Sequence, residues 1–171
     1  MNRHSVLIPV DGSDFSRQIF AHVIKFLPSQ DNKLILLRVG DQPEGYIGHP
    51  ARVVAPESGV EMYESARDVE AAAHPIYESQ ERESAEAAFL VEMQADIRTL
   101  TEAGYAVESQ VRFGEPGEAI VEFVLNHQIE LVAMTTHWRR GIDRLIFGSV
   151  AQYVAQRLSI PVLMVRADEP A

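Results

Sequence analysis

Runs of apolar residues alternate along this chain with segments whose apolar residues recur every three or four positions. Four such runs cover residues 5–10, 33–39, 131–135 and 161–165. Apolar runs of this length are typical of strands that are covered on both faces of a parallel sheet. Residues 105–113 instead alternate apolar and polar side chains, which is the pattern of a half-exposed strand at a sheet edge. The pattern therefore predicts five strands.

Four helices are predicted from the apolar residues that lie three or four positions apart. They cover residues 14–27, 78–103, 116–127 and 149–158. Pro28 and Gly104 end the first two, because proline cannot continue a helix and glycine is the preferred residue just beyond a helix end. Pro116 suits the first turn of the third helix.

Strands that alternate with helices predict an α/β fold, with a mostly parallel sheet, right-handed crossovers and helices on both faces. Such sheets bind ligands at the carboxyl ends of their strands, at the point where the strand order reverses. The turn Asp11-Gly12-Ser13 follows the first strand, and a long loop follows the fourth. If these two strands are neighbours, both loops meet at one crevice.

Residues 40–77 match neither pattern and are rich in glycine and proline. A structureless loop of this length is unusual inside a compact domain, so we expect an excursion over the surface, with a short acidic helix within residues 60–73. The length of 171 residues fits a single domain that covers residues 1–171 and includes this excursion.

Composition narrows the class of protein. Hydrophobic residues make up 46% of the chain and cysteine is absent, which excludes a disulfide framework and thiolate metal sites. The absence of cysteine is compatible with a reducing cytoplasm. The sequence shows no secretory signal. It also has no apolar run as long as the roughly 20 residues that span a bilayer, so we expect a cytoplasmic protein without a membrane partner.

The formal net charge of −10 is concentrated in one segment. Between Glu57 and Glu92, ten acidic residues stand against only Arg67 and Arg82, so this segment carries −8. A surface of this sign repels a nucleic-acid backbone, and DNA or RNA binding is therefore not expected.

The stretch 134–150 joins the fourth strand to the last helix and is the main candidate for a ligand site. Gly148-Ser149 marks the helix N-terminus, whose free N–H groups and positive dipole end attract anions. The loop before it adds three cations, Arg139, Arg140 and Arg144. One interpretation is a phosphate site. The other is that Ser149 merely caps the helix and that the arginines are solvated.

No pattern of catalytic residues stands out. Asp11 and Asp14 could form a metal or phosphoryl site, but an acid in the first turn of a helix is favoured in any case. The six histidines include no pair at the spacing of a helical metal site. A nucleophile elbow, a Walker lysine loop and a dinucleotide fingerprint are all missing. We therefore expect no enzyme activity beyond, at most, a slow ATPase.

Four segments carry a resemblance to a known family. They read IPVDGS near the start, LLRV in the second strand, GEPGEAI before the third helix and FGSVAQYVAQRLSIPVLMVR at the end. Together they resemble the universal stress protein family. The resemblance covers essentially the whole chain. It implies a single-layer, five-stranded parallel sheet of order 3-2-1-4-5, which is a Rossmann-like fold of the adenine nucleotide alpha hydrolase type. It also implies a homodimer that pairs through the fifth strand, from Ile160 to Val165.

The resemblance further implies that the crevice between strands one and four binds an adenine nucleotide, with ATP, with or without Mg²⁺, as the ligand. By this likeness Pro9, Val10 and Val39 frame the adenine, and Asp11 binds the nucleoside. Ribose and phosphates lie beside a loop segment formed by Met134, Thr135, Thr136, His137, Trp138 and Arg139. The phosphate oxygens are held by Gly148, Ser149 and Val150. The protein would then act in the stress response by binding and signalling.

One departure from the family pattern leaves a second function open. Nucleotide-binding members carry G-x-x-G, nine residues and then G-S/T, whereas Thr135 and Trp138 stand here at the two glycine positions. Glycine lets a backbone approach a ligand closely, and Thr and Trp do not. Trp138 either obstructs the ligand or stacks on it. The alternative function is thus a nucleotide-free dimeric interaction protein.

Overall fold

The structure is a computed structural model and describes residues 3–42, 53–54, 62–63, 75–136 and 148–166. The chain divides into two compact units, Met1–Asp41 with Phe89–Ala171, and Gln42–Ala88. In the second unit, β3 (Val53–Val54) and β4 (Met62–Tyr63) form an antiparallel pair. The short acidic helix expected within residues 60–73 does not include residues 62 and 63, which pair as a strand. The other residues of that range lie outside the described part of the chain, so the helix itself stays a prediction.

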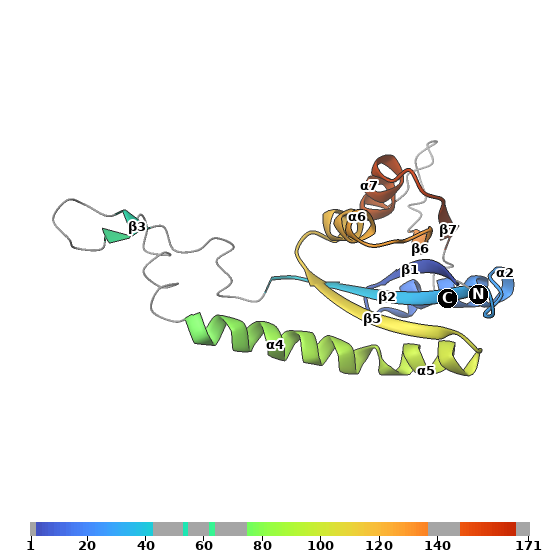
Figure 1. Cartoon of the computed structure of the whole chain (residues 1–171), viewed down its shortest axis with the longest axis horizontal. Helices are drawn as coiled ribbons and strands as arrows, with labels where there is room; N and C mark the ends of the chain where they lie inside the picture. Colours follow the sequence, from blue (N-terminus) through green and yellow to red (C-terminus); the bar gives the residue numbers. More distant parts are fainter. Residues whose placement is uncertain (1–2, 43–52, 55–61, 64–74, 137–147, 167–171) are drawn as a thin grey trace. The chain divides into compact units, whose positions relative to one another are not determined.

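The first unit is built on a five-stranded sheet whose neighbouring strands are parallel. Its strands are β1 (His4–Val10), β2 (Asn32–Gly40), β5 (Ala106–Phe113), β6 (Leu131–Thr136) and β7 (Val162–Arg166). They lie in the order β5-β2-β1-β6-β7 (Figure 1), which is 3-2-1-4-5 when the strands of this sheet are numbered along the chain. This order confirms the predicted fold class. The alternating strand, β5, lies at an edge as its pattern predicted.

Helices connect the strands of this sheet. They are α1 (Asp14–Arg17), α2 (Ile19–Phe26), α4 (Pro75–Glu92), α5 (Gln94–Glu102), α6 (Pro116–Asn126) and α7 (Ser149–Arg157). The first two predicted helices are each interrupted at one residue, Gln18 and Met93. Both residues keep helical backbone angles (φ −58°, ψ −22° and φ −75°, ψ −9°). In the described part of the chain, no helix is long and apolar enough to cross a lipid bilayer.

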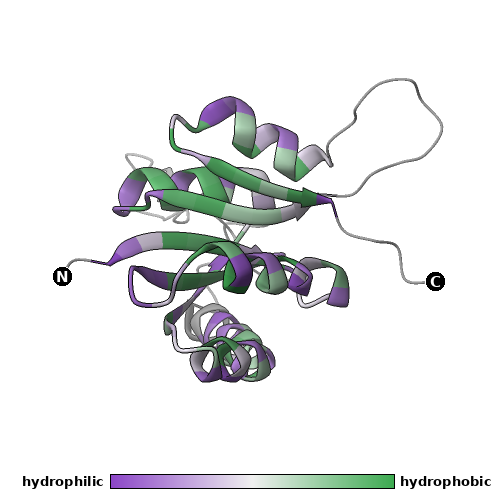
Figure 2. Cartoon of the chain, turned by 90° about the vertical axis from the view of Figure 1, so that its right-hand side faces the viewer, coloured by the Kyte–Doolittle hydropathy of each residue, from purple (hydrophilic) through white to green (hydrophobic). Residues whose placement is uncertain are grey.

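Each face of the sheet carries its own apolar cluster, because successive residues of a strand point to opposite faces. Leu34 and Leu36 of β2 pack in one cluster with residues of α2, α4 and α5. Ile35 and Leu37 pack in the other cluster, with residues of α6 and α7. Figure 2 shows hydrophobic residues along the strands and a mixture of hydrophobic and hydrophilic residues on the helices. A strand covered on both faces has to be apolar at nearly every position, which accounts for the run at residues 33–39.

Two polar contacts fix helices on the α2 side of the sheet. The Tyr105 hydroxyl lies against the carbonyl oxygens of Leu27 and Val23, at the C-terminal end of α2. Val23 O already accepts from Leu27 N, so the hydroxyl mainly supplies a donor to the Leu27 carbonyl, which follows the last turn of α2 and has no partner within the helix. Between α1 and α5, Arg17 Nε donates to Asp96 Oδ1 over 2.7 Å.

Candidate functional site

The strands β1 and β6 end side by side at the centre of the sheet. They pair directly, Val6 with Leu131 and Leu7 with Val132, as predicted. After β1 the chain enters α1 and α2 on one face, and the helix that follows β6, α7, packs on the other face. The strand order thus reverses between β1 and β6, which is the position where sheets of this type bind ligands.

The N-terminus of α7 is attached to the end of β6. Gly148 N donates to Thr136 Oγ1 over 3.1 Å, and Thr136 is 5% exposed. The bond connects the two residues that flank residues 137–147. It therefore fixes where α7 begins relative to the carboxyl end of the sheet.

The first turn of α7 has no side-chain cap among the described residues. Gly148 is the N-cap and Ser149 the first helical residue, so Ser149 is not the cap that one interpretation of the sequence required. In α1, by contrast, the Ser13 hydroxyl accepts from Ser16 N over 3.1 Å. Since no described side chain caps the first turn of this nine-residue helix, its N–H groups are available among the described residues for an anion.

Asp11, at the carboxyl end of β1, is held in a fixed orientation. Its Oδ1 accepts from Ser13 N (2.9 Å) and from Ser13 Oγ (2.6 Å). Partial burial alone would raise the pKa of the Asp11 carboxyl, but the hydrogen bonds from Ser13 and Ser16 outweigh it, and the pKa lies below its ordinary value. Asp11 is therefore a carboxylate at neutral pH and acts as an acceptor of hydrogen bonds.

The other predicted site residues fall into four groups. Val39, Met134 and Val150 pack in the cluster of α6 and α7, on the same face of the sheet as one another. Val10 packs in the cluster on the opposite face, so only its backbone is at the crevice. Pro9 and Thr135 are half-buried at the strand ends. His137, Trp138 and Arg139, with the loop arginines 140 and 144, lie outside the described residues.

A cavity of about 150 Å³ lies where the N-termini of α6 and α7 meet. Ser149 and Val150 line it from α7, and Glu115 and Glu118 line it from the start of α6. The helices approach closely here because Gly117 has no side chain. A Cβ atom at this position would lie only 3.0 Å from the ring of Tyr153. The sequence analysis missed both carboxylates, because the contact between these helices joins residues more than 30 positions apart.

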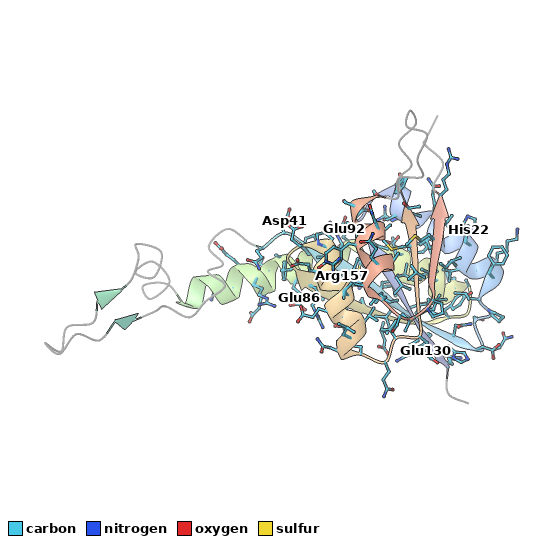
Figure 3. The ribbon with its side chains drawn as sticks, turned by 90° about the horizontal axis from the view of Figure 1, so that it is seen from above. His22, Asp41, Glu86, Glu92, Glu130 and Arg157 are labelled. Atoms are coloured by element: carbon cyan, nitrogen blue, oxygen red, sulfur yellow. The ribbon has the colours of Figure 1, made fainter. Side chains whose placement is uncertain are left out.

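The last turn of α4 covers the ends of β1 and β2. Glu92, labelled in Figure 3, lies on Gly12, whose φ is +81° and whose added Cβ would be 2.1 Å from Glu92 Oε1. Phe89 lies on Gly40 in the same way, at 2.4 Å. Arg38 contacts both side chains, with Glu92 Oε2 at 3.6 Å from its Nε and the Phe89 ring at 4.6 Å. Arg38, a cation inside the run 33–39, is the sequence signal that could have located this cluster.

Metal binding by protein side chains alone has no support in the described residues. No group of three or more His, Asp or Glu side chains there is placed to hold an ion. The arrangement of an uncapped helix N-terminus, a threonine hydroxyl and a carboxylate acceptor is suited to binding a polar ligand with an anionic end.

A comparison of this sequence with models of protein families shows the family to which the chain belongs. The model of the universal stress protein family matches residues 2–166. This chain belongs to that family. The membership agrees with the strand order and with the motifs at the carboxyl edge of the sheet.

Individual members of the family differ widely from this universal stress protein in sequence. Universal stress protein MJ0531 of Methanocaldococcus jannaschii is 29% identical over 161 residues, which cover 94% of this chain and 81% of the other. The structure of hypothetical protein MJ0577 of the same organism superimposes with a TM-score of 0.65 at 20% identity, covering 99% and 100% of the two chains. An Arabidopsis thaliana family member with AMP bound gives 0.57 at 16% identity, covering 96% and 92%. At these identities the structures establish the common fold.

Proposed function

We propose that this universal stress protein binds an adenine nucleotide at the carboxyl ends of β1 and β6 and acts in the stress response through binding, without strong catalysis. The observation that carries the proposal is the uncapped N-terminus of α7, which the Thr136–Gly148 hydrogen bond places at the end of β6. A related structure with AMP bound supports an adenine nucleotide as the ligand.

The charges at the two ends of the site determine the orientation of the ligand. The Asp11 carboxylate repels phosphate but accepts hydrogen bonds from a ribose hydroxyl or an amino group. The N–H groups at Ser149 and Val150 attract phosphate. The nucleoside therefore lies toward Asp11, Pro9 and the end of β2 at Val39, and the phosphates lie against the start of α7.

Two carboxylates favour ATP that is neutralised by Mg²⁺. Glu115 and Glu118 line the same cavity as Ser149, so a bare triphosphate meets negative charge beside the helix N-terminus. Mg²⁺ prefers oxygen ligands and is usually bound by one or two carboxylates together with substrate phosphates. We expect ATP to bind more tightly in the presence of Mg²⁺ than in its absence.

Thermal unfolding with and without ATP tests the proposal. A ligand at a hundred times its dissociation constant raises the free energy of unfolding by about 2.7 kcal/mol, which shifts the melting temperature clearly. We expect this shift with ATP and Mg²⁺ and a much smaller one with GTP at the same concentration. If millimolar ATP produces no shift, the protein does not bind nucleotide, and a dimeric interaction protein becomes the better account.

We also propose that the protein is a homodimer paired through β7. In the described sheet β7 has β6 on one side only, and Val162 and Met164 are half-buried in the cluster of α6 and α7. An open apolar edge of this kind invites pairing with a second chain. Light scattering at micromolar concentration should show a dimer for the parent and a monomer for the double variant Val162→Lys, Met164→Lys. A monomeric parent, or a folded variant that stays dimeric, would contradict this interface.

A further inference from the structure

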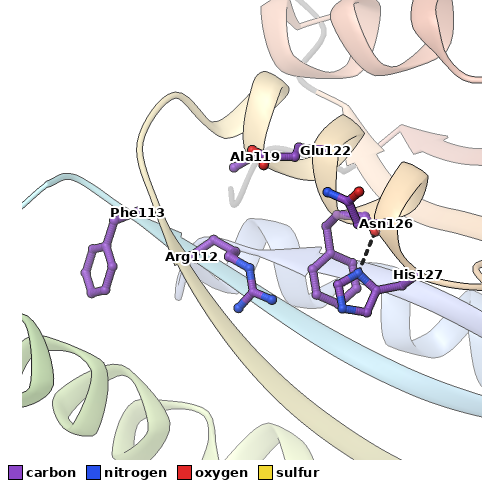
Figure 4. A pocket seen from close by; sticks show the side chains of 7 residues that line it. Arg112, Phe113, Ala119, Glu122, Asn126 and His127 are labelled. Carbon is purple, nitrogen blue, oxygen red and sulfur yellow. Dashed lines mark hydrogen bonds between the residues drawn. The ribbon is translucent and has the colours of Figure 1, made fainter. Parts of the chain in front are cut away.

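A second cavity, of about 260 Å³, lies between β5 and α6, outside the proposed nucleotide site. Arg112 lines it from β5, and Glu122, Phe123, Asn126 and His127 line it from α6 and its C-cap. Figure 4 shows Arg112 extending from the strand toward His127 at the end of the helix. Pockets for drug-sized ligands typically hold about 300–1,000 Å³, so this cavity fits a smaller molecule.

The Arg112 guanidinium is held in place by one of its two terminal nitrogens. Nη1 donates to Val111 O over 2.7 Å and to Gln110 Oε1 over 3.4 Å, and the group lies 5.1 Å from the centre of the Phe123 ring. A guanidinium has five N–H donors, and the pair on Nε and Nη2 forms a fork that matches a carboxylate. Among the described residues, Arg112 forms no ion pair with any acidic side chain. In the described part of the chain this fork has no acidic partner, and we expect it to be open to a ligand.

His127 supplies a hydrogen-bond acceptor on the opposite side of the cavity. Its ring stacks on Phe123, with 3.9 Å between centres and 10° between planes, and its Nδ1 lies 2.8 Å from Phe123 O. A carbonyl oxygen only accepts, so Nδ1 carries the proton and Nε2 of the neutral ring is an acceptor. The Glu122 carboxylate is a second acceptor at the rim and repels any second negative charge on a ligand.

We infer that this cavity binds a small amino-carboxylate, a molecule of the free amino acid class. Its carboxylate pairs with the Nε and Nη2 fork of Arg112, and its ammonium group, which has three N–H donors, donates both to Glu122 and to His127 Nε2. One negative and one positive charge on the ligand match the charges of the lining, whereas phosphate and dicarboxylates place extra negative charge beside Glu122. Arg112 is in register with Val39 of β2, so the cavity lies next to the nucleotide site but shares no residue with it.

The test is a nucleotide-free NMR titration in which the His127 ring and the amides of Gln110 to Phe113 are followed. The probes are L-alanine, L-serine and L-leucine at millimolar concentrations, with propionate, methylamine and inorganic phosphate as controls. We expect at least one amino acid to shift these signals saturably, and each control to bind at least tenfold more weakly. If no amino acid shifts them, or if propionate or phosphate binds equally well, the inference is wrong.

Three variants locate the ligand. Arg112→Gln should lower the amino acid affinity at least tenfold, whereas Arg98→Gln, the same change at an exposed position of α5, should leave it unchanged. Glu122→Gln is an exposed substitution that leaves the Arg112 contacts intact. It should weaken the binding of the amino acid several-fold without weakening that of propionate. Equal affinity in Arg112→Gln and the parent, or an unchanged ratio of amino acid to propionate affinity in Glu122→Gln, would overturn the proposed site.

Discussion

Replacing Ser149 with aspartate should weaken ATP binding at least tenfold. The substitution places a negative charge at the first residue of α7, where the proposed phosphate chain lies. Tenfold corresponds to about 1.4 kcal/mol, which is less than the repulsion of two charges a few ångströms apart near a protein surface. An acid in the first turn of a helix stabilises that helix, so the fold should be retained. Titration calorimetry with ATP and Mg²⁺ measures the effect.

The matched control carries the same substitution beyond the other end of the same helix. Ser159 is exposed and follows α7, so Ser159→Asp adds the same charge to the protein far from the phosphate site. Its ATP affinity should stay within twofold of the parent value. Equal affinities in Ser149→Asp and the parent would mean that the phosphates lie elsewhere.

Replacing Arg17 with methionine should lower the free energy of unfolding by about 2–3 kcal/mol. Arg17 Nε lies 2.7 Å from Oδ1 of Asp96, which is 5% exposed, so the variant leaves a buried carboxylate without its cation. Breaking a buried pair in this way typically costs about 3–5 kcal/mol, and the 30% exposure of the Arg17 side chain places this case toward the lower end. The second partner of Arg17, Asp14, is fully exposed and contributes little.

Urea unfolding checks this value against two further variants. Arg98→Met makes the same change at an exposed position of α5 and should alter stability by less than about 0.5 kcal/mol. Adding Asp96→Leu to Arg17→Met should recover part of the loss, because an apolar pair needs no charge compensation. A loss below about 1 kcal/mol for Arg17→Met alone would show that the pair does not hold α1 against α5.

Local patterns predicted the strands themselves and the edge position of β5, whereas the full strand order was implied by the resemblance to the universal stress protein family. The alternation at residues 105–113 is a local signal that places β5 at an edge. An apolar run does not determine the place of a strand by itself, because the runs at 33–39 and 131–135 lie inside the sheet and the run at 161–165 lies at its other edge. The interruptions at Gln18 and Met93 were not predicted, because both residues keep helical backbone angles and the apolar spacing continues past them. The pairing of residues 62 and 63 was also not predicted, since two-residue strands have no periodicity to detect.

The proposed nucleotide site could be predicted in part for the same reason. Asp11 follows the end of a strand and Ser149 begins a helix, and both positions are marked by local sequence signals. Glu115 and Glu118 reach Ser149 only through the packing of α6 on α7, and Glu92 reaches Gly12 across a gap of 80 residues. Contacts of this kind depend on the tertiary arrangement, and the sequence carries no spacing that reports them.

The backbone ¹H–¹⁵N spectrum, titrated with ATP and Mg²⁺, tests the nucleotide site most directly. We predict that the amides of Asp11, Thr136, Ser149 and Val150 shift together with a single dissociation constant, while those of α5 stay unchanged. The largest shifts should belong to Ser149 and Val150, whose backbone N–H groups are the proposed donors to the phosphates. The absence of any shift at millimolar ATP, or saturable shifts confined to residues away from the ends of β1 and β6, would contradict the proposed site.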